Sequence, residues 1–184
     1  RTPPALPTRT HILYIYKDTM EVPTTYSPNL PATLRATINL PSSKSISNRA
    51  LLLCALSGPD SSVERMSNCD DTYVMWRALT QRPDTVDIMA AGTAMRFMTA
   101  YFAICRGEEH TITGTERMRQ RPIKVLVDAL RQLGADISYV DNEGYPPLHV
   151  KGRSLQGGRI SLPASVSSQY ISALLLVAPT MAQG

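Results

Sequence analysis

A lysine, a serine and an arginine stand at the start of an apolar segment near residue 44. Lys44 and Ser45 are adjacent, and Arg49 lies four residues after Ser45, on the same face of a helix. Cations on an otherwise apolar helix are costly unless they are paired with negative charge. The pattern predicts a clamp for a phosphate or carboxylate, in which arginine supplies a fork of donors and lysine a point charge. A structural salt bridge with an acidic residue elsewhere in the chain is the alternative.

Two further apolar segments begin with small or hydroxyl residues, at 91–93 and 166–169. The N-terminus of a helix presents free N–H groups and about half a positive charge, and small residues let an anion approach closely. Three helices built in this way predict a common anion-binding face, with the helices packed side by side and their N-termini on one side. Serine and glycine are also ordinary N-cap residues, which is the competing interpretation for each helix.

Arginines are concentrated before another helix, in the run RMRQRP at 117–122. Arg121 is the best candidate for an inward role because Pro122 fixes the chain beside it. A solvated basic loop is the alternative. Arg96, on the first turn of the apolar helix after Gly92, is either structural or anion-facing.

The elements that position these residues follow a repeated α/β pattern of strand, apolar helix, strand, amphipathic helix and further strands. Helices are expected over 45–56, 70–80 with Asp70 at its N-cap, 92–105, 122–133, and from Ser167 onward. Strands are expected over 11–17, 34–40, 62–65, 85–90, 110–114, 135–140, 147–152 and 158–163. The third repeat stops after its first helix. Residues 1–33 are expected to be a lead-in with one strand, and residues 34–184 an incomplete domain.

Composition excludes several classes of protein. The 184 residues are 43% hydrophobic and 18% charged, with a net charge of +4. No apolar run approaches the roughly 20 residues that span a bilayer, and the N-terminal apolar stretch is too short for a signal peptide, so a cytoplasmic location is expected. Scattered basic residues and only 6% aromatic residues argue against nucleic-acid binding. Cys54 and Cys105 lie in apolar helical runs and are expected to be buried, and no metal site is expected because no ligand spacing occurs.

Five ordered motifs resemble one enzyme family. They are PSSKSISNRALLLCAL at 41–56, DDT at 70–72, AGTAMRF at 91–97, RMRQRPI at 117–123 with LVDALRQLGA at 126–135, and VSSQYISALLL at 166–176. The first is very similar to the signature of 5-enolpyruvylshikimate-3-phosphate synthase, and the others match that family in the same order. The resemblance covers residues 34–184.

The resemblance implies the fold and the reaction. The family has two similar domains, each made of three βαβαββ units in an inside-out α/β barrel, with helix N-termini facing the cleft between them. This chain would be the N-terminal domain with its third unit truncated and the second domain absent. The family transfers the enolpyruvyl group of phosphoenolpyruvate to the 5-hydroxyl of shikimate 3-phosphate, in the shikimate pathway of aromatic amino-acid biosynthesis. It releases phosphate through a tetrahedral intermediate and uses no cofactor.

The resemblance also implies roles for single residues. Lys44 would touch both substrates and assist proton transfer, and Gln169 would lie between them. Gly92 and Arg121 would bind phosphoenolpyruvate. Shikimate 3-phosphate would be bound by Ser45, Arg49, Ser167 and Ser168. The family's acidic proton-transfer residues would belong to the absent C-terminal domain.

Two positions depart from the family pattern. Ala90 replaces an asparagine, which removes any polar contact from that position, and Phe97 replaces a proline in the helix that carries Gly92. The main hypothesis is an enzyme half-site that binds its anions weakly and is inactive alone. The alternative is a self-sufficient binding module for a phosphorylated ligand or nucleic acid on the same fold.

Overall fold

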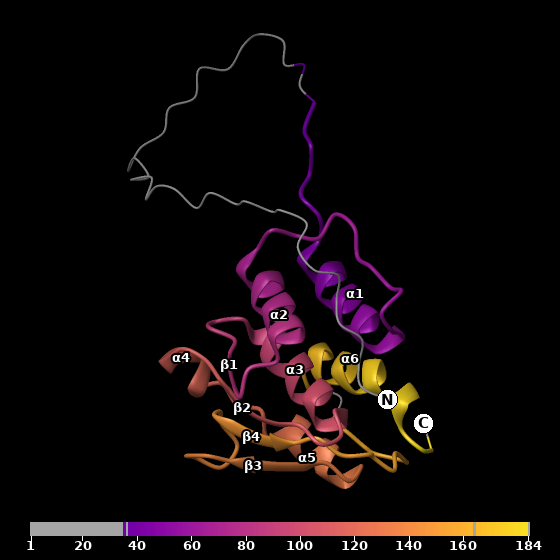
Figure 1. Cartoon of the computed structure of the whole chain (residues 1–184). Helices are drawn as coiled ribbons and strands as arrows, with labels where there is room; N and C mark the ends of the chain where they lie inside the picture. The colour runs from indigo at the N-terminus through magenta and orange to yellow at the C-terminus, as the bar shows by residue number, and fades with distance from the viewer. Residues whose placement is uncertain (1–34, 36, 164, 184) are drawn as a thin grey trace.

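One mixed four-stranded sheet organises the chain in a computed structural model, which describes residues 35, 37–163 and 165–183 (Figure 1). Neighbouring strands follow the order β1-β2-β4-β3. β1 runs parallel to β2, whereas β4 is antiparallel to both β2 and β3. The strands are β1 (Thr85–Asp87), β2 (Glu109–Thr113), β3 (Asp136–Tyr139) and β4 (Leu148–Lys151).

The helices cover one another and the sheet. The described residues form α1 (Lys44–Ser57), α2 (Asp70–Gln81), α3 (Gly92–Ile104), α4 (Glu116–Arg119), α5 (Lys124–Gln132) and α6 (Ser168–Val177), with a 3₁₀ turn, η1 (Ala178–Thr180), after α6. None of these helices combines the length and apolarity needed to cross a bilayer.

Helix α3 is the centre of the core. It packs on α1, α2, α5 and α6 and also on strands β2 and β4, and Figure 1 shows it between the sheet and the pair α1–α2. Phe97, Met98 and Phe102 have no exposed surface. A helix that is apolar on all sides is typical of such a position. The elements from β1 to β4 follow the order strand, helix, strand, helix, strand, strand, apart from the short α4, which confirms the predicted α/β unit.

Three of the predicted strands are not found among the described residues. Arg35 and residues 37–40 are not in a strand, and Ile38 and Leu40 are 78% and 85% exposed. A strand leaves its backbone groups unpaired unless another strand lies beside it, and the described residues place none there. Residues 62–65 are irregular because Arg65 adopts φ 49°, which an extended strand excludes. The segment 158–163 starts at Gly158 with φ 124° and forms no ladder.

Several element boundaries differ from the sequence prediction. β1 ends at Asp87 because Met89 turns the chain with φ 53°. The N-cap of α2 is Cys69, so Asp70 is the first helical residue, where the helix dipole favours its charge. α5 begins at Lys124, two residues later than expected. The short helix α4 was not predicted. The elements expected within residues 1–33 lie outside the described residues, and the domain boundary at residue 33 stays a prediction.

Buried cysteines line the core as expected. Both Cys54 and Cys105 are buried. Burial raises the pKa of the Cys105 thiol to about 11, so the thiol is neutral near pH 7. The prediction that these residues act as small hydrophobic groups is confirmed.

A cluster of charged side chains links the C-terminal end of α2 to the start of β2. Arg82 donates to both carboxylate oxygens of Glu108, at 2.8 and 2.6 Å. The buried His110 ring contacts the same carboxylate at 3.0 Å and the Pro83 carbonyl at 2.8 Å. Both ring nitrogens face acceptors. Glu108 is therefore the common partner of one arginine and one histidine.

Replacing Glu108 by alanine is expected to lower the free energy of unfolding by about 2–3 kcal/mol, somewhat less than for a fully buried pair, because Arg82 and His110 lose their carboxylate together. Urea denaturation followed by circular dichroism measures this. Glu109→Ala is the matched control: among the described residues this neighbour pairs with the partly exposed His149 and Lys151, so its loss should cost less than about 1 kcal/mol. Equal losses for both variants would contradict a special role for Glu108.

Candidate functional site

The N-terminal turns of α1, α3 and α6 converge. Arg49, in the second turn of α1, donates through Nη2 to Ser172 Oγ of α6 at 3.1 Å. Its Cζ lies 5.5 Å from the centroid of the Phe97 ring of α3. Since Phe97 and Ser172 also lie in second turns, the three helix starts gather in one region, as the sequence predicted.

The start of α1 exposes its charged group. Lys44 Nζ lies 3.2 Å from Asp71 Oδ1, and the two side chains are 49% and 21% exposed. The salt bridge that the sequence left as an alternative is therefore present. An ion pair this exposed contributes about 0–1 kcal/mol, so the amino group can leave it for another anion at little cost. Ser45 is exposed, and its carbonyl accepts from Arg49 Nη1 at 2.9 Å.

The start of α3 lies under an arginine from a distant segment. A Cβ placed on Gly92 would lie 2.6 Å from Nη1 of Arg121 and 3.2 Å from its Cζ. The guanidinium therefore rests against the one position in this turn that has no side chain. The structure brings together Gly92 and Arg121, which the sequence singled out separately. It thereby adds a cation to the positive end of the α3 dipole.

The start of α6 presents two hydroxyl groups. Ser167 is the N-cap, and its Oγ accepts from the Gln169 backbone N–H at 3.3 Å. Ser167 and Ser168 are exposed, and Gln169 is half-buried. The N-cap interpretation therefore holds for Ser167, while its hydroxyl hydrogen and the Ser168 hydroxyl remain on the surface.

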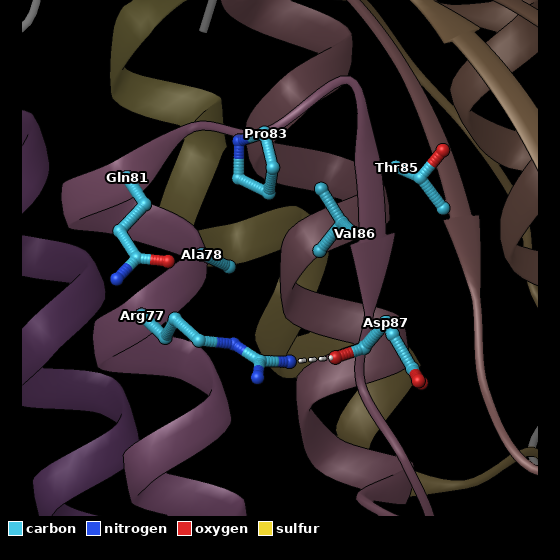
Figure 2. Close-up of a pocket in the computed structure, with 7 residues that line it drawn as sticks. All are labelled: Arg77, Ala78, Gln81, Pro83, Thr85, Val86 and Asp87. Carbon is cyan, nitrogen blue, oxygen red and sulfur yellow. Dashed lines mark hydrogen bonds between the residues drawn. The ribbon is translucent and has the colours of Figure 1, made fainter.

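Two hollows border helix α2. The smaller, of about 130 Å³, lies between the first turn of α2, residues 88–91 and Thr115, and Ala90 lines it. The larger, of about 300 Å³, lies between the second half of α2 and β1 and contains no predicted site residue (Figure 2). There Arg77 donates to the Asp87 carbonyl at 2.7 Å. The candidate site is thus an open surface at the helix starts rather than the larger hollow.

Sequence reasoning gave no site role to Asp71, Tyr170 and Ser172, and it used Pro122 only as the residue that fixes the chain beside Arg121. Asp71 was recognised only as part of the start of α2. Ser172 looked like an ordinary helical residue. Tyr170 carried a usable signal, because a buried tyrosine hydroxyl usually needs a hydrogen-bond partner. It is buried and donates to the Pro122 carbonyl at 2.8 Å.

Comparisons with known proteins agree on one family. The model of the family EPSP synthase (3-phosphoshikimate 1-carboxyvinyltransferase) matches residues 28–82 and 80–184. A 3-phosphoshikimate 1-carboxyvinyltransferase of Bacteroides fragilis strain YCH46 is 58% identical over 159 residues, which are 86% of this chain and 38% of the relative. The enzyme of that name from Pseudoalteromonas atlantica is 41% identical over 172 residues, 79% of this chain and 40% of the relative.

A solved structure shares the fold. EPSP synthase from Acinetobacter baumannii superposes with a TM-score of 0.70 at 21% sequence identity, over 78% of this chain and 38% of that one. The chain thus spans about two fifths of the length of the relatives it matches. Because the family model covers nearly all of residues 28–184, this chain belongs to the EPSP synthase family.

Proposed function

We propose that this chain supplies one half of the active site of an enolpyruvyl transferase. The 5-hydroxyl of shikimate 3-phosphate loses its proton as its oxygen adds to C2 of phosphoenolpyruvate, and C3 gains a proton. The tetrahedral intermediate then loses phosphate from C2 and a proton from C3. The contact between Arg121 and Gly92 at the start of α3 is the observation that carries the proposal, because it concentrates positive charge where a phosphate is to be bound.

Phosphoenolpyruvate is assigned to the α3 side of the surface. Gly92 lets the anion approach the backbone N–H groups, and Arg121 supplies a planar fork of donors for the phosphate. Lys44 leaves Asp71 to contact this substrate and to assist proton transfer. Gln169 lies between the two ligands.

Shikimate 3-phosphate is assigned to the starts of α1 and α6. Ser167 and Ser168 hold its phosphate through their hydroxyl groups. Ser45, Arg49 and Lys44 hold the rest of the molecule. The support is the bond from Arg49 to Ser172, which joins the two helices whose starts carry these groups.

The proposed partner of this chain is the C-terminal domain of the same protein, which supplies the acidic groups for proton transfer. Without it the surface is open to water, which weakens electrostatic attraction several-fold relative to a closed site. General acid–base help commonly contributes about 10²- to 10⁴-fold. The chain alone is therefore expected to bind weakly and not to turn over. A cytoplasmic location stays a prediction.

A phosphate-release assay with both substrates tests the proposal. We expect turnover by the complete protein and none by the 184-residue chain. The chain should bind shikimate 3-phosphate, sulfate or phosphate weakly, and the binding should fall with added salt. Turnover by the chain near the rate of the complete protein would mean that it holds a whole active site. Absence of turnover in the complete protein would instead favour the alternative, a binding module.

Gly92→Ala is expected to raise the KM for phosphoenolpyruvate by about tenfold or more, because the new methyl group displaces the Arg121 guanidinium. The KM for shikimate 3-phosphate should change by less than about twofold. Stability should change little, since the crowded atoms end a flexible side chain. Steady-state kinetics of the complete protein with each substrate varied in turn gives both values.

A double-mutant cycle supplies the control for Gly92→Ala. In an Arg121→Ala background the added methyl group has no guanidinium to displace, so its effect should become smaller, and the remainder measures the obstruction of the backbone N–H groups. An undiminished effect in that background would mean that Gly92 acts independently of Arg121. Equal losses for both substrates would contradict the division of the surface.

A further inference from the structure

Two side chains from different helices hold one carbonyl beside Arg121. The carbonyl oxygen of Pro122, the next residue, accepts from Tyr170 Oη of α6 at 2.8 Å and from Arg96 Nη2 of α3 at 3.3 Å. Pro122 has a fixed φ and no N–H, so this oxygen is its only backbone group for hydrogen bonding. The chain at Arg121 is therefore tied to both α3 and α6.

Arg96 also bonds to Gly92, the residue that the Arg121 guanidinium contacts. It is only 5% exposed, and its Nη1 donates to the Gly92 carbonyl at 3.1 Å. Its Cζ lies 5.6 Å from the centroid of the Tyr170 ring. One guanidinium thus bonds to Gly92 at the start of α3 and to Pro122, beside the arginine that covers this start.

The contacts of Arg96 argue against a role in core packing alone. Its described partners are two carbonyl oxygens, the Met118 sulfur and an aromatic face, and none of them carries a formal charge. Nε is buried without a hydrogen-bond partner among the described residues. A buried cation with only neutral partners is costly for stability alone. The same cation lies behind a surface that has to attract an anion.

We infer that Arg96 and Tyr170 are positioning residues that hold Arg121 over Gly92 through the Pro122 carbonyl. Neither residue needs to touch a substrate. The Tyr170 hydroxyl and the Arg96 guanidinium fix the backbone from which Arg121 extends, and the Arg96–Gly92 bond fixes the helix start that Arg121 covers. The inference deepens the proposed function, on which it rests, by assigning the orientation of the phosphoenolpyruvate-binding arginine.

Tyr170→Phe in the complete protein tests this with the smallest change, because it removes one oxygen and keeps the ring beneath Arg96. We expect the KM for phosphoenolpyruvate to rise about three- to tenfold, the effect of one lost hydrogen bond on orientation. The KM for shikimate 3-phosphate and kcat should stay within about twofold. Arg96→Lys keeps the charge but cannot reach both carbonyls, and should show the same pattern.

Amide hydrogen exchange gives a measurement that does not depend on catalysis. The Arg121 N–H donates to the Met118 carbonyl at 3.0 Å and the Ile123 N–H to the Gly144 carbonyl at 2.8 Å. Both amides should exchange several-fold faster in Tyr170→Phe, because the carbonyl between them loses the shorter of its two hydrogen bonds. Tyr139→Phe is the matched control, since the Tyr139 hydroxyl is buried without a partner among the described residues. It should leave both amides and both KM values unchanged.

The possible outcomes distinguish the positioning role of Tyr170 and Arg96 from the proposed enolpyruvyl transfer. A raised KM for phosphoenolpyruvate together with faster exchange supports the positioning role. Unchanged exchange and an unchanged KM in Tyr170→Phe overturn it, and so does an equal rise of both KM values. If the unaltered complete protein shows no enolpyruvyl transfer, the proposed function fails. Exchange at Arg121 and Ile123 then still decides whether Tyr170 holds this segment.

Discussion

Lys44→Ala in the complete protein should lower kcat by about 10²- to 10⁴-fold, the usual contribution of general acid–base help. The loss follows from the proposed role of Lys44 at both substrates. The free energy of unfolding should change by less than about 1 kcal/mol, because the Lys44–Asp71 pair is exposed and alanine is a good helix former. Phosphate release and thermal unfolding measure the two quantities.

Lys124→Ala is a close control for Lys44→Ala. Lys124 is also the first residue of a helix, is 50% exposed on its side chain, and pairs with Glu143 at 2.5 Å. Its partners Asp128 and Glu143 are not among the residues proposed to bind substrate, so its loss should leave kcat unchanged. A large fall in the unfolding temperature of Lys44→Ala with unchanged kinetics would show that the salt bridge with Asp71 is its real role.

Gly152→Ala should lower the free energy of unfolding by about 3 kcal/mol or more. A Cβ at this position would overlap the backbone carbonyl of Cys105 and lie 2.8 Å from the Phe102 carbonyl oxygen. These are backbone atoms at the end of α3, so they cannot swing aside as the end of a long side chain does. Urea denaturation, or a loss of folded protein on expression, would reveal the change.

Gly107→Ala separates crowding from backbone strain. Gly107 donates to the Gly152 carbonyl at 3.1 Å, adopts φ 84°, and would have open space around an added Cβ. Only the left-handed conformation penalises alanine there, which costs about 1–2 kcal/mol. Similar losses for the two variants would mean that the contact with Cys105 relaxes easily.

Periodicity predicted the helices well because burial determines them. α3 is apolar on all sides and lies at the centre of the core, and both limits of α1 and the start of α6 agree with the sequence to within about one residue. The glycines that end helices were also informative, since Gly58 adopts φ 116° directly after α1. These signals are local, so one sequence suffices to read them.

Strands were harder because they depend on distant partners. The pattern at 34–40 alternates as well as the one at 110–114, yet only the second lies between neighbouring strands. The candidate site was also predictable only in part. Lys44, Gly92 and Arg121 were singled out by residue type and position, but the contact between Gly92 and Arg121 depends on folding across distant segments. The same holds for the shared carbonyl of Pro122.

The guanidinium of Arg77 also bears on solubility. β1 is an outer strand of the sheet. The carbonyl of Asp84, just before β1, and the N–H of Ile88, just after it, both bond to β2, so the Asp87 carbonyl faces outward. An open edge invites pairing with a strand of another molecule. Here such pairing would break the bond from Arg77 and bury its charge (Figure 2). Because β1 has only three residues and the Arg77 guanidinium is bonded to its outward carbonyl, aggregation through this edge is disfavoured.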